Sequence, residues 1–123
     1  MQEHLTIKLS GISLSGIMSH AAEQESILLN EFLFNKAKIE DMLTGYYFNT
    51  RGRIYNVTIN KPVMDAQNRG YLYVYYFIGH FNACADIDSY EEEKMKLSFV
   101  LNLDKAEVKI SGEYFPEREP DEF

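Results

Sequence analysis

The chain has few of the residues that build disulfides, metal sites and phosphate-binding loops. It contains one cysteine among 123 residues, Cys84, so no disulfide can form within the chain and no multi-cysteine metal site can be built. Its seven glycines are scattered next to expected turns, which excludes a glycine-rich loop that cradles phosphate groups. A Gly-x-Ser-x-Gly nucleophile motif is also missing. We therefore expect no enzyme activity, no catalytic residues, no metal, no cofactor and a reducing compartment.

Long hydrophobic runs are missing as well. No apolar stretch approaches the roughly 18 residues that cross a bilayer. The first residues, MQEHLTIKLSG, lack the basic and apolar segments of a secretory signal. The sequence therefore predicts a cytoplasmic protein without membrane association.

Basic residues are scarce, and the acidic excess is unevenly placed. The net charge is -7. Residues 1–82 contain seven acidic and seven basic side chains, whereas residues 83–123 contain twelve and five. Clustered Lys and Arg bind phosphate backbones, and the sequence offers a local basic excess only at Arg51 and Arg53. These features disfavour direct nucleic-acid binding and favour a basic protein partner, while solubility alone also explains an acidic surface.

The most informative segment that is present is YLYVYYFIGHF, which begins at Tyr71 and is typical of a β-strand. Alternation along a strand places these residues on two faces: Tyr71, Tyr73, Tyr75 and Phe77, and opposite them Leu72, Val74, Tyr76 and Ile78. We expect the face with Leu72, Val74 and Ile78 to lie under a helix. The tyrosine face is then either a binding surface or core against a neighbouring subunit.

The hydrophobic periodicity of the whole chain predicts the α+β class. A strand is expected from Leu5 to Leu14 with a bend or break at Gly11, followed by an amphipathic helix that begins after Ser19 and stops at Gly45. A break near residues 35–38 would divide this helix. Further strands are expected at residues 54–59, 71–81, 94–103 and 107–114, and the last two form a hairpin. Residues 60–70 and 86–93 are expected to be loops.

The predicted fold is thus one long helix, whole or broken, packed on an antiparallel sheet of about five strands in the order β-α-β-β-β-β. Residues 1–115 are expected to form a single α+β domain, and residues 116–123 an acidic C-terminal tail. This order of elements resembles the cystatin and monellin fold. The inhibitory motif of cystatins, Gln-x-Val-x-Gly, would fall where this chain reads NKPVMDAQNRG, so the resemblance implies topology and not protease inhibition.

Two clusters could carry chemistry. His80 and Cys84 are four residues apart, but a strand would separate them by about 13 Å, so structural roles are expected. The acids Asp86, Asp88 and Glu92 lack the calcium-loop pattern. We predict a solvated acidic connector there and not a metal site.

The last 28 residues, KLSFVLNLDKAEVKISGEYFPEREPDEF, combine an amphipathic hairpin with an acidic tail. In this they are similar to some small bacterial toxin-immunity proteins. The resemblance implies an acidic cytoplasmic protein that neutralises a basic toxin. We predict a non-catalytic protein-binding module, an immunity or inhibitor protein, with these partner-binding residues: Tyr71, Tyr73, Tyr75, Asp86, Asp88, Glu117, Glu119, Asp121 and Glu122.

Two other functions stay open. A small-molecule or peptide binder would use the cleft between helix and sheet, with Tyr46, Tyr76 and His80 as polar groups. A chaperone-like or assembly protein would use an exposed aromatic face and form a homodimer.

Overall fold

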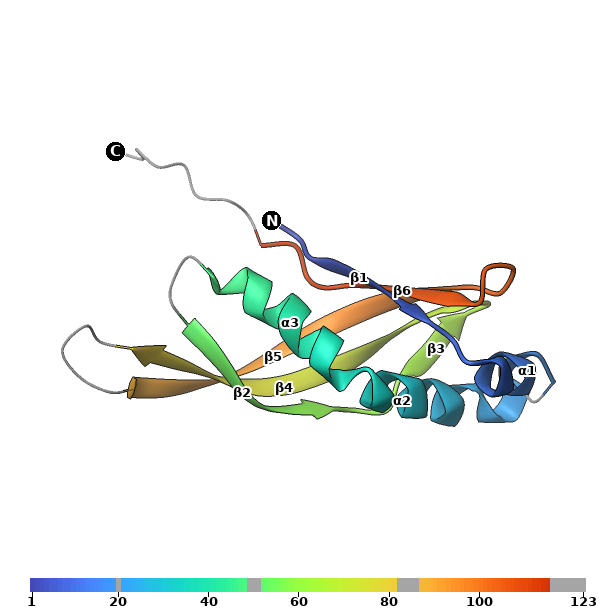
Figure 1. Ribbon diagram of the computed structural model, residues 1–123, viewed down its shortest axis with the longest axis horizontal. Helices are drawn as coiled ribbons and strands as arrows, with labels where there is room; N and C mark the ends of the chain where they lie inside the picture. Colours follow the sequence, from blue (N-terminus) through green and yellow to red (C-terminus); the bar gives the residue numbers. More distant parts are fainter. Residues whose placement is uncertain (20, 49–51, 82–86, 116–123) are drawn as a thin grey trace.

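The computed structural model describes residues 1–19, 21–48, 52–81 and 87–115, and for residues 21, 80, 81 and 87–89 it describes the backbone only. The protein has the predicted α+β class, with an antiparallel, curled sheet. The helices all lie on the same side of this sheet (Figure 1).

The helices follow the first strand and come before all the others. In chain order the elements are β1 (His4–Lys8), α1 (Gly11–Ser19), a single 3-10 turn η1 (Ala21–Glu23), α2 (Gln24–Phe34), α3 (Lys36–Tyr46), β2 (Gly52–Ile59), β3 (Val63–Ala66), β4 (Arg69–Phe81), β5 (Ile87–Asn102) and β6 (Glu107–Ser111). The prediction of one long helix is therefore wrong. Among the described residues five strands follow the helices, where the sequence predicts four.

The strand order across the sheet is β1-β6-β5-β4-β2, and β3 pairs with β4 on the same edge as β2. The first and last strands are therefore neighbours, with Leu5 opposite Ile110 and Ile7 opposite Val108. A bulge interrupts β2 between Tyr55 and Thr58, where Asn56 has a φ of 54°. Asn tolerates this left-handed conformation better than most residues, which explains a bulge at this position.

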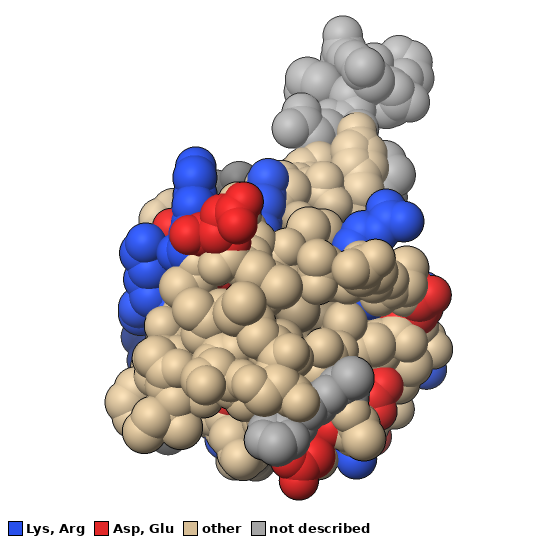
Figure 2. Space-filling model, turned by 90° about the vertical axis from the view of Figure 1, so that its right-hand side faces the viewer, with Lys and Arg blue, Asp and Glu red and all other residues tan. Residues whose placement is uncertain are grey.

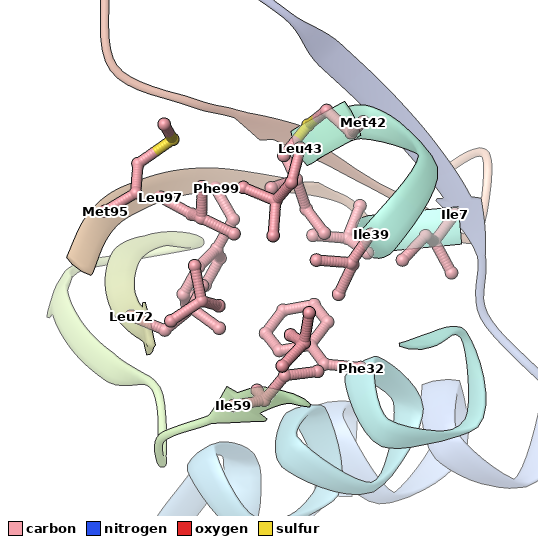
Figure 3. Packing of buried hydrophobic residues seen from close by; sticks show 14 of the residues in the cluster. Ile7, Phe32, Ile39, Met42, Leu43, Ile59, Leu72, Met95, Leu97 and Phe99 are labelled. Atoms are coloured by element: carbon pink, nitrogen blue, oxygen red, sulfur yellow. The ribbon is translucent and has the colours of Figure 1, made fainter. Parts of the chain in front are cut away.

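The core lies between the helices and the inner face of the sheet. Figure 3 shows Phe32 of α2 and Ile39 of α3 pointing toward Leu72 and Phe99 of the sheet. The rings of Phe32 and Phe99 meet edge to face, with their centroids 5.6 Å apart. Among the hydrophobic residues that the structure describes, those with 0% of their surface exposed are Ile7, Leu28, Phe32, Ile39, Leu43, Val74, Leu97, Val108 and Ile110.

The alternation predicted for the aromatic strand is confirmed. Leu72, Val74 and Ile78 belong to the core, each at most 3% exposed, and Tyr76 is buried with them. Their neighbours on β5 are Leu97, Met95 and Glu91 in the observed pairing.

The segment after Gly11 is a helix and not the predicted continuation of a strand. Ser10 begins it as an N-cap: its Oγ accepts a hydrogen bond from the N–H of Ser13 at 3.1 Å, and its carbonyl accepts one from Leu14 at 2.9 Å. Leu14 and the buried Ile17 are three residues apart, which is a helical spacing. Ser19, after which the sequence predicts the start of a long helix, is instead the last residue of α1.

The predicted break near residues 35–38 is confirmed at Asn35, which separates α2 from α3. Both its backbone N–H and its side-chain amide donate to the carbonyl of Glu31, at 3.1 and 2.8 Å, and its own carbonyl accepts from Lys38 and Ile39. Asn35 thus ends one helix and starts the next. Gly45 does not stop α3, because the helix continues through it to Tyr46.

Two segments expected to be loops contain strand. Within residues 60–70, β3 pairs with the start of β4 through a turn at Asn68, whose φ is 61°. Within residues 86–93, β5 already begins at Ile87, opposite Phe81, and after a shift in register it pairs with β4 from Ser89 opposite His80 onward. This acidic sequence forms a strand because the hydrogen bonds between strands join backbone groups and do not depend on the side chains. The side chains of β4 provide neighbours for it to pack against.

Tyr46 joins the end of α3 to the start of β1 and the end of β6, which lie side by side. Its hydroxyl donates to the carbonyl of Glu113 at 2.7 Å and accepts from the N–H of Glu3 at 3.0 Å. A Cβ atom on Gly112 would lie 2.3 Å from this hydroxyl oxygen and 3.0 Å from two ring carbons. Glycine at position 112 is therefore what allows the ring to fit against the backbone.

We predict that Gly112→Ala lowers the free energy of unfolding by about 1–3 kcal/mol, because the new methyl group overlaps a buried ring that cannot simply swing away. Urea unfolding followed by circular dichroism measures this. The matched control is Gly11→Ala, where a Cβ would meet nothing within 4 Å at the start of α1, and where alanine should leave stability unchanged or raise it slightly. Equal effects of the two substitutions would contradict the prediction.

Candidate functional site

The face of the sheet that points away from the helices is the candidate binding surface. Side chains of this open face alternate with the core residues along β1, β4, β5 and β6, and along β2 on either side of its bulge. On β4 they are Tyr71, Tyr73, Tyr75 and Phe77, which we call the tyrosine row; all four are partly exposed. The three tyrosines predicted as partner-binding residues are thus neither core nor fully bare.

The rings of the tyrosine row contact one another and the lysines of the next strand. The Tyr71 and Tyr73 rings lie edge to face, 5.9 Å apart. The Nζ atom of Lys96 lies 4.5 Å from the centre of the Tyr71 ring, and that of Lys94 lies 5.1 Å from the Tyr73 ring. An ammonium group at these distances is attracted to the electron-rich ring face. The row therefore presents positive charge on top of aromatic surface.

The open face gathers basic residues from several strands. Register places Lys94 beside Tyr75, Lys96 beside Tyr73, and Val100 between Arg69 and Lys109. Among the described side chains, the cations of this face are Lys8, Arg53, Arg69, Lys94, Lys96 and Lys109, and its carboxylates are Glu92, Glu107 and Glu113. Lys8 pairs with Glu107 at 2.9 Å and lowers the pKa of that carboxyl group through the hydrogen bond between them.

This cluster is not evident from the sequence, because its cations come from several strands and are not consecutive along the chain. Lys94 and Lys96 alternate with the core residues Met95 and Leu97, and that alternation was the available signal. Adding Arg69 and Lys109 needed the strand pairing, which the sequence does not show.

Two further aromatic side chains meet at the far end of the open face. Tyr55 of β2 and Tyr90 of β5 flank Gly79 of β4, and their rings lie 5.7 Å apart. A Cβ on Gly79 would be 2.8 Å from the Tyr55 ring and 3.2 Å from that of Tyr90. The two rings thus cover the glycine and extend the aromatic surface beyond Phe77.

The acidic residues predicted to contact a partner are mostly not placed. Asp86, Glu117, Glu119, Asp121 and Glu122 lie outside the described residues, and so does Cys84. Asp88 lies in β5 and His80 in β4, where only the backbone is described. The structure does describe the side chains of three acids that follow Asp88 in the chain, Glu91, Glu92 and Glu93. All three are exposed, and they belong to β5 and not to a connector.

The helix-sheet cleft proposed for a small ligand is filled by side chains where it is described. Tyr46 and Tyr76 are buried, and the hydroxyls of Tyr76 and Tyr47 hydrogen-bond to each other at 2.8 Å. Burial raises the pKa of all three tyrosines above the usual 10.0, most strongly for Tyr76, because the charged form would lose its hydration. Three surface hollows of about 430, 320 and 420 Å³ are lined by other residues.

A second exposed surface lies at the end of the molecule formed by α1. Figure 2 shows a broad uncharged area at this end, with charged residues around its margin. Ile12 is 87% and Met18 66% exposed, and α1 contains no charged residue. Nothing in the structure shows what covers this area.

Within residues 1–19, 21–48, 52–81 and 87–115, no three His, Cys, Asp or Glu side chains are grouped so that they could hold a metal ion. No helix in the same ranges is both long and apolar enough to cross a membrane.

Comparison of the chain with protein-family models, curated proteins and solved structures finds no match. The function must therefore be argued from the geometry of the molecule.

We predict that Tyr73→Ala and Leu72→Ala, although adjacent, differ clearly in their cost to stability. Leu72 is 1% exposed, so removing its side chain leaves a cavity and should lower the free energy of unfolding by about 2–5 kcal/mol. Tyr73 loses mainly cross-strand contacts, which should cost about 1 kcal/mol. Urea denaturation of both variants measures the difference, and a cost for Tyr73→Ala as large as that for Leu72→Ala would show that the tyrosine row is core.

We also predict that the protein loses stability as the pH rises above about 10. Tyr76 stays protonated in the folded state, whereas the unfolded chain releases its proton near the ordinary pKa of 10.0. The unfolded state then binds fewer protons, so the free energy of unfolding falls with pH, by at most about 1.4 kcal/mol per pH unit for this one group.

Urea unfolding from neutral pH to about pH 11, with tyrosinate absorbance recorded in parallel, measures this loss. The variant Tyr76→Phe should be less stable at neutral pH but show a shallower alkaline decline. The prediction is contradicted if all nine tyrosines ionise near pH 10 while the protein stays folded, because burial then does not raise the pKa of Tyr76.

Proposed function

We propose that the protein is a non-catalytic protein-binding module, and that the open face of the sheet is its binding surface. The observation that carries this proposal is the tyrosine row. Four aromatic side chains lie side by side on β4, point away from the helices and stay partly exposed. Tyrosine is enriched at protein interfaces because its ring supplies large, rigid apolar area and its hydroxyl a polar contact.

The sheet holds the backbone of the tyrosine row in a fixed position, which favours binding. Tyr71 and Tyr75 are held by strands on both sides, since β4 pairs with β5 throughout and with β3 and β2 on the other edge. Tyr73 pairs with Lys96 of β5, and on the other edge its carbonyl accepts a hydrogen bond from the N–H of Asn60, just after β2. Side chains held on a rigid, two-sided ladder lose little freedom when a partner binds, which lowers the entropic cost of association.

An immunity or inhibitor protein is one form of this function, because it acts by covering a surface of its partner and needs no reactive group. The similarity of the last 28 residues to such proteins supports this form. The prediction of a basic partner rests on acids that lie mostly outside the described residues, so it stays a prediction, as does a homodimer.

The proposal is tested by photo-crosslinking in cells that make the protein. A benzoylphenylalanine at position 73 should give a covalent adduct with one defined protein. The control places the same group at Phe34 of α2, which is 86% exposed but lies on the helix side. An adduct specific to position 73 supports the proposal; the same adducts at both positions, or no adduct at either, would overturn it.

A further inference from the structure

We infer that the open face binds an extended, acidic segment of its protein partner, whose carboxylates contact Lys94 and Lys96. This inference rests on the protein-binding function proposed above and names the chemistry of the partner. It departs from the basic partner that the sequence predicts, because the fold gives the candidate surface the opposite charge from the chain as a whole.

The first argument is the local charge. Lys94 and Lys96 of β5 and Arg69 of β4 lie next to the tyrosine row. Lys109 of β6 lies opposite Val100 of β5, which in turn lies opposite Arg69. Lys8 forms an ion pair with Glu107, whereas no carboxylate of the described residues lies at ion-pair distance from Lys94, Lys96, Arg69 or Lys109. The carboxylate of Glu113 accepts a hydrogen bond from the backbone N–H of Lys96 at 2.8 Å, but it is not at ion-pair distance from the ammonium group of Lys96. The ammonium groups of Lys94 and Lys96 are thus left for a partner.

The second argument is preorganisation. Both ammonium groups rest on tyrosine rings, at 5.1 and 4.5 Å from the ring centres. Long lysine side chains normally lose much rotational freedom when they form an ion pair. Here the rings already restrict them, so a carboxylate that meets them pays a smaller entropic cost.

The third argument is spacing. Lys94 and Lys96 are alternate residues of a strand and therefore lie about 6.8 Å apart. Alternate side chains of any extended segment have this same spacing. A partner segment with acids at positions i and i+2 can thus contact both lysines at once, while its apolar side chains lie against the tyrosine row.

The arrangement fits a protein segment better than a nucleic acid. Single-stranded nucleic acids bind by stacking bases on free aromatic faces, and Lys94 and Lys96 already lie over the rings of Tyr73 and Tyr71. A long phosphate backbone along the row would also reach Glu92, which lies beside Phe77. A short acidic segment at the Lys94 and Lys96 end avoids that repulsion.

The test uses three labelled probes: a peptide of about ten residues that alternates Glu with Leu and Tyr, the same peptide with Lys in place of Glu, and oligothymidylate of similar length. Binding is followed by fluorescence anisotropy, and amide chemical shifts locate the contact. We expect the Glu peptide to bind, to weaken with salt, and to shift the amides of β4 and β5. The double variant K94Q/K96Q should bind it roughly tenfold less tightly.

The matched control is K36Q/K38Q, which removes the same charge from α3 on the helix side and should bind the Glu peptide like the original protein. The inference is overturned if the Lys peptide or the oligonucleotide binds as tightly as the Glu peptide. It is overturned too if K94Q/K96Q has no effect, or if no probe binds.

The photo-crosslinking experiment distinguishes a failure of the acidic-segment inference from a failure of the proposed binding function. If position 73 captures a protein but the captured segment has no acidic residues, the acidic-segment inference fails while the binding function stands. If position 73 captures nothing, the binding function itself fails.

Discussion

The pairing of β4 with β5 is the constraint on which the rest of the molecule depends. It runs without a break in register from Arg69 opposite Val100 to His80 opposite Ser89. Side chains of a strand alternate strictly between its faces, so a shift of one residue would expose Leu72 and Val74 and bury the tyrosine row. One register therefore decides both what the helices cover and what the open face presents. The core and the candidate binding surface are two sides of the same ladder.

The parts of the fold that the sequence predicts correctly are those decided by local periodicity. Leu72 and Val74 alternate with the tyrosines at positions 71, 73 and 75, and the break at Asn35 interrupts a clear helical repeat. The errors arise where a partner element decides the outcome. Residues 63–66 and 87–93 form strands because β4 offers them a ladder, and α1 is short and uncharged, so that its main signal is the Ser10 cap.

The candidate site divides in the same way. The tyrosines are visible in the sequence because they belong to one strand. The lysines and Arg69 are not, because three strands bring them together, and a count of charge along the chain averages over both faces of each strand. The last third of the chain is strongly acidic, yet Lys94, Lys96 and Lys109 all lie on one face of it. Net charge is thus a poor guide to the charge of a particular surface.

The neighbourhood of β1 and β6 has a consequence for how the chain folds. Their paired residues, such as Ile7 and Val108, are separated by nearly the whole chain. Contacts this distant in sequence form slowly, since a long loop must close first. During synthesis the first strand must therefore wait for the last, and Leu5 and Ile7 stay without their partners in the meantime. In that interval the unpaired, apolar first strand makes the nascent chain vulnerable to aggregation. Rapid pairing of β4, β5 and β6 shortens the interval and so protects the first strand.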